Sequence, residues 1–195
     1  MPPWHDGATA PRKVLLFSGH MIDAPDRKDM RFPPDKEPIA AGAIARTLDQ
    51  IEARSDDLAI SGAACGGDLL FAEACLARGV RLELYIPFEE RRFLVESIDF
   101  ADADWRSRFV AAKKHASLHL MPNELGPLPP GTNPYERNNL WMMESAMKFG
   151  PEKVEFVCLW DGRGGDGPGG TRHLMQEVRN RAGRTHWLNT TQLWN

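Results

Sequence analysis

The residues most suited to chemistry form a glycine-rich turn after the short apolar run 58–60. Glycines let a backbone approach a ligand closely, and the first N–H groups of a helix attract anions. The turn enters a helical pattern, so it predicts either a phosphate site or a close-packed turn without a ligand. Its terminal aspartate can cap the helix instead of facing a ligand. The residues concerned are Ser61, Gly62, Gly66, Gly67 and Asp68.

A second glycine-rich turn, over 161–171, follows the strongly apolar run 154–160. Trp160, at the end of that run, could stack on a base or close the core. Asp161 could form the turn before Gly162 or contact a ribose hydroxyl. Ser18 and Gly19 end the first apolar run, at another place where a strand edge could meet a ligand.

Apolar runs and helical patterns alternate along the chain, which predicts an α/β protein. We expect a Rossmann-like three-layer sandwich with a mainly parallel central sheet, in one domain over 1–195 with a loose arm at 1–11. Long surface loops are expected at 21–36, where Arg27, Lys28 and Arg31 either reach an anion or are only solvated, and at 122–133. The expected strands are 13–18, 58–60, 81–86, 117–121, 154–160 and 184–188, and the expected helices are about 39–51, 68–79, 103–115, 134–149 and 171–182.

Composition excludes several classes of function. The formal net charge is −3 in 195 residues, which argues against a DNA-binding surface. No run of 18 apolar residues predicts a membrane span, and no apolar segment near the start predicts a secretory signal. Cys65, Cys75 and Cys158 lack metal-ligand spacing and suggest buried free thiols in a cytoplasmic protein. The six histidines are scattered, so we expect no metal and no cofactor.

Three motifs resemble those of known nucleotide-binding families. The stretch SGAACGGDLLFAEACLARG, over 61–79, resembles the S-G-x-A-x-G-x-D motif of the Smf/DprA family. YERNN, over 135–139, and GPGGT, over 167–171, resemble the E-R-K and P-G-G-x-G-T motifs of the lysine-decarboxylase-like or LOG family. Both families belong to the SLOG superfamily of Rossmann-like domains. The resemblance spans about residues 13–188 and implies a site for a nucleotide or a nucleotide derivative.

The LOG resemblance also implies roles for single residues. LOG enzymes are phosphoribohydrolases, and by this likeness Gly169, Gly170 and Thr171 would hold a phosphate while Arg137 would act on the sugar. The chain departs from the pattern, because Asn138 replaces the motif lysine and Leu174 stands where the catalytic glutamate is expected. Glu177, Glu73 and Glu136 are the carboxylates left to replace it. Arg137 could equally form a surface ion pair with Glu136 or Glu144.

Two functions remain as hypotheses. Cleaving an N-glycosidic bond needs a carboxylate beside an oxocarbenium-like centre, and a phosphate cradle alone does not supply one. A module that binds a nucleotide-derived ligand, as a sensor, therefore fits better than a nucleotide N-glycosidase using Arg137 with Glu177, Glu73 or Glu136. We also expect a homodimer through the helix over 134–149, because Trp141 and Met142 point away from Met143 and Met147.

Overall fold

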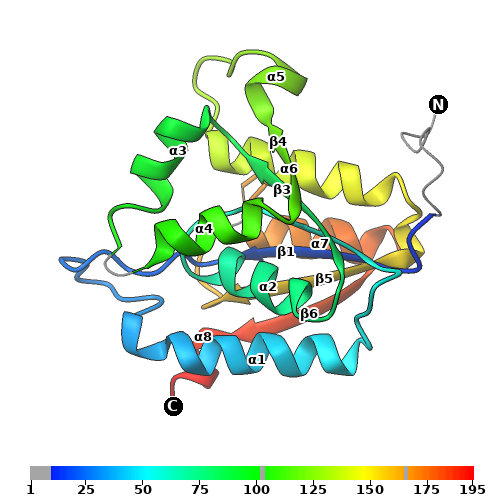
Figure 1. The fold of residues 1–195 in the computed structure, drawn as a ribbon, viewed down its shortest axis with the longest axis horizontal. Coiled ribbons are helices and arrows are strands. Elements are labelled where there is room, and N and C mark those ends of the chain that lie inside the picture. Colours follow the sequence, from blue (N-terminus) through cyan, green and yellow to red (C-terminus); the bar gives the residue numbers. More distant parts are fainter. Residues whose placement is uncertain (1–9, 102–103, 165–166) are drawn as a thin grey trace.

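Six parallel strands form the centre of the molecule, in the spatial order β4-β3-β2-β1-β5-β6 (Figure 1). The computed structural model describes residues 10–101, 104–164 and 167–195. Helices cover both faces of the sheet, so the expected α/β three-layer arrangement is confirmed, and the sheet is wholly parallel. The strands are β1 (Val14–Gly19), β2 (Leu58–Ser61), β3 (Arg81–Ile86), β4 (Ala116–Leu120), β5 (Val154–Trp160) and β6 (Arg184–Asn189).

The helices divide between the two faces of the sheet. On one face lie α1 (Glu37–Gln50), α2 (Gly67–Leu76), α3 (Glu90–Ser97), α4 (Trp105–Lys113) and the short α8 (Thr190–Leu193). On the other face lie α6 (Pro134–Met147) and α7 (Thr171–Asn180). The remaining elements are α5 (Met121–Leu125) and the 3-10 turns Pro34–Lys36 and Pro151–Lys153. No helix in the described ranges is long and apolar enough to cross a membrane.

The order of the strands creates a switch point between β1 and β5. From β1 the chain builds β2, β3 and β4 on one side, and it then crosses back to place β5 and β6 on the other. At such a point the loops after the two central strands diverge, and ligands of open α/β sheets bind in the crevice between them. The ends of β1 and β5 are therefore the place to look for a site.

Two hydrophobic cores hold the layers together, one on each face of the sheet. The central strands are mostly apolar on both faces, and all seven residues of β5 are buried, with Glu155 as the one charged residue among them. On the α2 face, Phe17 of β1 stacks on Phe71, with ring centroids 4.7 Å apart. The three cysteines are buried and free, as expected, and burial raises the pKa of each thiol.

Both expected surface loops are more structured than the sequence indicated. The segment 21–36 contains the buried residues Ile22 and Phe32 and ends in a 3-10 turn. The segment 122–133 begins inside α5, which starts directly at the end of β4. The expected arm falls on residues 1–9, which lie outside the described residues, and on Ala10 and Pro11, of which Pro11 is buried.

Helix α6 corrects the argument for a dimer. Asn133 caps this helix as expected, since its side chain accepts hydrogen bonds from the N–H groups of Tyr135 and Glu136. Trp141 and Met142, however, are both buried in the core beneath the helix. The Trp141 ring packs edge-on against Tyr85 of β3, at 4.5 Å between centroids. The surplus apolar surface on which the dimer was predicted is therefore absent, and the oligomeric state stays a prediction.

Candidate functional site

His20 joins the ends of β1 and β5 at the switch point. Its own N–H donates to the carbonyl oxygen of Leu159 (2.9 Å), and its Nε2 accepts the N–H of Asp161 (3.1 Å). The side chain is buried, and burial together with the nearby charge of Arg31 lowers its pKa to about 4, although Asp161 acts in the opposite direction. A neutral imidazole therefore ties the two strand ends together at physiological pH.

Asp161 forms the turn that follows β5. Its Oδ1 accepts the N–H of Arg163 and its Oδ2 accepts the Nε of the same residue, both at 2.9 Å. Burial opposes ionisation, but the hydrogen bonds from Arg163 outweigh it and hold the pKa of Asp161 below its usual value. Arg163 also reaches Asp29 in the 20–32 loop, at 3.3 Å. This is the geometry of a turn-forming aspartate, which was one of the two expected roles.

The 20–32 loop presents Arg31 at the same edge. The N–H groups of Arg31 and Phe32 both donate to Asp23 Oδ2 at 2.8 Å, which fixes the backbone on one side. Trp194, just after α8, fixes the other side, because its indole N–H donates to the Arg31 carbonyl (3.1 Å) and its ring stacks on Phe32. The backbone at Arg31 is thus held by two separate parts of the molecule.

The guanidinium of Arg31 is a half-buried charge in this region. No residue in the described ranges forms a hydrogen bond or ion pair with it, and its Nε is buried without a partner. Burial and the charge of Arg27 lower the pKa of Arg31, while Asp23 and Asp161 oppose this effect. The loop that carries Arg31 reaches the turn after β5, because Asp29 pairs with Arg163 (3.3 Å) and Arg163 pairs with Asp161 (2.9 Å). A buried donor usually has a hydrogen-bond partner, so the Nε of Arg31 distinguishes this arginine from the exposed charges of the same loop.

Backbone N–H groups of the first glycine-rich turn donate hydrogen bonds within the protein. Cys65 N–H donates to the Ser97 carbonyl (2.9 Å), and Gly67 N–H donates to the His20 carbonyl (3.0 Å). Gly66 has a φ of +101° and forms an antiparallel bridge with Met21. A side chain at Gly66 would meet the backbone at Ile22, so glycine is required for this close approach. The turn therefore packs against the loop after β1, and its N–H groups at Cys65 and Gly67 are not open to a phosphate.

Asp68 does not cap α2, contrary to expectation. Gly66 occupies the cap position, and Asp68 is the second residue of the helix. Its Oδ2 accepts the N–H of Ala64 at 3.3 Å and lies where a side chain at Gly62 would collide with it. Burial raises the pKa of Asp68 to about 7. Ser61, at the end of β2, is fully buried, and its hydroxyl has no hydrogen-bond partner among the described residues.

Ser18 and Gly19 are the last two residues of β1 and directly precede His20 in the chain. Ser18 is buried, and Gly19 is the last residue of the strand. A side chain at Gly19 would press on the Phe17 ring and on Leu159. Packing alone explains why residue 19 is a glycine. Ser18 and Gly19 belong to the candidate site only because they lie beside the switch point.

The second glycine-rich turn meets the start of α6, so the structure brings the two LOG-like motifs together. A side chain at Gly169 (φ +85°) would collide with the carbonyl of Glu136. The side chain of Asn139 donates to the Gly169 carbonyl (3.0 Å), and Gly169 N–H donates to His173 Nδ1 (3.2 Å). Gly170 is the cap residue of α7 and Thr171 its first residue, with no side-chain cap. The first turn of α7 therefore has no side-chain cap, whereas the Gly169 N–H is already bonded within the protein.

The expected catalytic residues are not assembled into one site. Arg137 donates to the backbone carbonyls of Leu125 (2.9 Å) and Pro127 (3.1 Å), and so holds the end of α5 rather than pairing with Glu136 or Glu144. Glu177 pairs with Arg181 at 3.2 Å, and Arg181 also pairs with Glu144. Arg137 is on α6 and Glu177 is on α7, and these two helices cover the same face of the sheet. Glu73 is on α2, which covers the opposite face.

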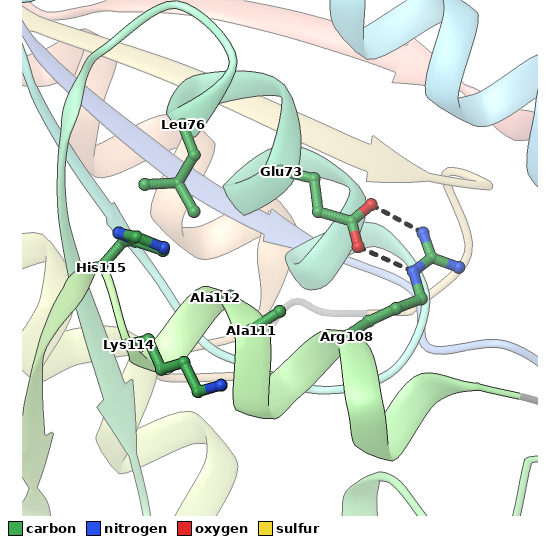
Figure 2. A pocket seen from close by; sticks show the side chains of 7 residues that line it. All are labelled: Glu73, Leu76, Arg108, Ala111, Ala112, Lys114 and His115. Atoms are coloured by element: carbon green, nitrogen blue, oxygen red, sulfur yellow. Dashed lines mark hydrogen bonds and ion pairs between the residues drawn. The ribbon is translucent and has the colours of Figure 1, made fainter.

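Glu73 has a structural partner instead. Its two carboxylate oxygens accept Nε and Nη2 of Arg108, both at 2.7 Å, as Figure 2 shows. The pair borders a hollow of about 430 Å³ between α2 and α4, whose floor includes Leu76 and Ala112. This hollow lies on the flank of the molecule and not at the ends of β1 and β5. Glu73 therefore gains no contact with the switch point.

Two tryptophans occupy the edge beside the 161–163 turn. Trp160 is buried in the core, and its indole N–H donates to the Arg163 carbonyl (3.0 Å). Trp187 of β6 is 44% exposed, and its indole N–H donates to the Trp160 carbonyl (2.9 Å). Sequence reasoning considered Trp160 for stacking and gave no role to Trp187. Trp160 ends an apolar run, whereas Trp187 lies among the polar residues of the edge strand β6, and that polar setting is the sequence signal for the exposed ring.

The fold and this edge define a Rossmann-like α/β protein with one unpaired arginine at its switch point. Within the described ranges, no group of three or more His, Cys, Asp or Glu residues could hold a metal ion. No protein-family model matches the chain, and no curated protein matches it. The functional argument therefore depends on the site itself.

Proposed function

We propose that this protein binds a nucleotide, or a nucleotide-derived small molecule, at the carboxyl edge of β1 and β5, as a binding or sensor module. The observation that carries the proposal is Arg31, whose guanidinium is half-buried and has no partner among the described residues and whose backbone is fixed by Asp23 and Trp194. A phosphate would supply the charge-assisted hydrogen bonds that this group lacks. The motif resemblance to SLOG domains supports a nucleotide as the source of that phosphate.

Binding is favoured over hydrolysis by the state of two of the three candidate carboxylates, Glu73 and Glu177. Glu73 and Glu177 are each engaged by an arginine, on opposite faces of the sheet. Neither is placed to stabilise an oxocarbenium-like centre beside a ligand at the switch point. The expected behaviour is therefore retention of an intact nucleotide, without release of free base.

Calorimetric titration of a panel of nucleoside monophosphates tests the proposal, with Arg31→Gln as the key variant. Charge-assisted hydrogen bonds contribute about 1.5–3 kcal/mol each, so we expect affinity to fall by tenfold or more. Lys28→Gln is the matched control, because it removes one charge from an exposed position in the same loop. We expect that control to change affinity by less than about threefold.

Three results would contradict the proposal. The first is no binding of any nucleotide by the wild-type protein, and the second is an equal loss in the two variants. The third is release of free base, detected by chromatography of the incubated mixture. Such release would make the protein a hydrolase. That outcome would direct attention back to Glu177 and Glu136.

A further inference from the structure

Trp187 presents a fixed aromatic ring to solvent at the ligand-binding edge. Its indole N–H is bonded to the Trp160 carbonyl, and one part of its ring packs at a tilt against Trp160, with centroids 5.5 Å apart. Gly162 lies so close that an added side chain would sit 3.2 Å from the ring. These contacts fix the orientation of the ring while 44% of the residue stays exposed. Because the side chain is already ordered, stacking a ligand on the ring would cost little side-chain entropy.

The ring and the Arg31 guanidinium flank the same turn. Trp187 lies against Gly162 and Trp160, on the side of the turn that faces α7. On the other side, Arg163 of the same turn pairs with Asp161 and with Asp29, two residues before Arg31. Trp187 and Arg31 are also linked through the chain, because β6 continues into α8 and then to Trp194, which donates to the Arg31 carbonyl. An aromatic platform and an unpaired cation thus belong to one edge, over β1, β5 and β6.

We propose that Trp187 stacks on the base of the ligand whose phosphate Arg31 binds. A planar π face and a cation complement a molecule with a planar ring at one end and an anion at the other, which describes a nucleoside monophosphate. The inference rests on the proposed function and assigns the base end of the ligand to β6. Base–aromatic stacking tolerates all four bases, so Trp187 sets affinity for a base more than the identity of that base.

Comparing AMP with ribose 5-phosphate isolates the contribution of the base. For the wild-type protein, we expect AMP to bind about 5- to 100-fold more tightly than ribose 5-phosphate. In Trp187→Ala this ratio should fall to near one, with ribose 5-phosphate affinity unchanged, and Trp187→Phe should restore most of it. Arg31→Gln should weaken both ligands by a similar factor and leave the ratio intact. Circular dichroism of each variant checks that the fold is retained.

The outcomes separate the two proposals. If ribose 5-phosphate binds but the ratio is the same in wild type and Trp187→Ala, the stacking assignment is wrong and the phosphate site stands. A loss of ribose 5-phosphate affinity in Trp187→Ala, equal to that for AMP, also overturns the assignment, since the ring would then act on the whole site. If the wild-type protein binds neither ligand, both proposals fail together.

Discussion

Asp68 places a carboxyl group beneath the first glycine-rich turn, facing Gly62 and the backbone of Ala64. Only one hydrogen bond supports the charged form, so burial raises the pKa of this group to about 7. In the unfolded chain an aspartate titrates near its ordinary value, about 3.9. The folded state therefore holds the proton more tightly, and ionised Asp68 costs stability as the pH rises from about 4 to 7.

Asp68→Asn is expected to stabilise the protein at pH 8 more than at pH 5. The amide oxygen can still accept the Ala64 N–H, while the cost of burying a charge disappears. We expect the gain in free energy of unfolding to be about 2 kcal/mol larger at pH 8, since the α2 N-terminus offsets part of the penalty. Urea unfolding at the two pH values measures this difference. The exposed Asp26→Asn provides the control for a lost charge, and a similar pH dependence in both variants would refute the prediction.

At the scale of elements, Arg108 joins three helices. It comes from α4, binds Glu73 of α2 through two nitrogens, and reaches Glu37 at the start of α1 with the third, at 2.7 Å. Its guanidinium also lies over the Trp105 ring, 3.9 Å from the centroid. The bonds to Glu73 and Glu37 raise the pKa of Arg108, so this charge is permanent. Such a network assigns Glu73 to packing of the helix layer rather than to catalysis.

Removing this contact is expected to weaken the helix layer. Arg108→Ala should lower the free energy of unfolding by about 1–2 kcal/mol, because the paired carboxylates lose their partner and Trp105 loses the stacked group. Arg108→Lys should retain only part of this free energy, since an ammonium group cannot form the bidentate hydrogen bonds to Glu73. Arg106→Ala, on the same helix and paired with Asp99 at an exposed position, should cost much less than Arg108→Ala, because solvent screens an exposed ion pair. Equal losses at the two positions, measured by thermal or urea unfolding, would show that Arg108 is no more than a surface charge.

At the scale of the whole molecule, alternation of apolar runs and helical patterns was enough to predict the architecture. The expected bounds 154–160 and 81–86 coincide with β5 and β3, because 154–160 is almost wholly apolar and 81–86 alternates polar with apolar residues before it becomes apolar. The parallel sheet followed from helices lying between successive strands. Burial on single helices was less certain. The apolar pattern that predicts the helix 39–51 begins at Ile39, which is 39% exposed, whereas Ala43 and Ile44 of the same pattern are buried as expected.

The site was harder to predict than the fold, because it depends on contacts between distant segments. The glycines of the first turn were recognised, but the sequence did not show that the loop after β1 would take their N–H groups at Cys65 and Gly67. The sequence left open whether Arg31 reaches an anion or is only solvated, because the contacts of Asp23 and Trp194 with its backbone come from distant segments. Local patterns report spacing, whereas an unpaired guanidinium is a property of the folded molecule.

The same limit applies to assembly, where α6 gave a misleading signal. Its apolar residues exceed one helical face, which suggested a second surface for a partner chain. In the fold α6 lies in a groove formed by β1, β2 and β3 on one side and α7 on the other, so Trp141 and Met142 are buried within one chain. These residues should therefore contribute to folding of the single chain rather than to an interface.

Met142→Ala distinguishes the two roles. If Met142 belongs to the core of one chain, the substitution leaves a cavity and should lower the free energy of unfolding by about 2–4 kcal/mol at every protein concentration. An interface residue would behave differently, because the stability of an obligate dimer depends on protomer concentration by mass action. Urea midpoints at 1 and 100 μM, with sedimentation velocity of wild type and variant, measure both properties. A midpoint that rises with concentration in wild type, together with dissociation in the variant, would restore α6 as the dimer surface. A concentration-independent loss places Met142 in the monomer core, whatever other surface a second copy uses.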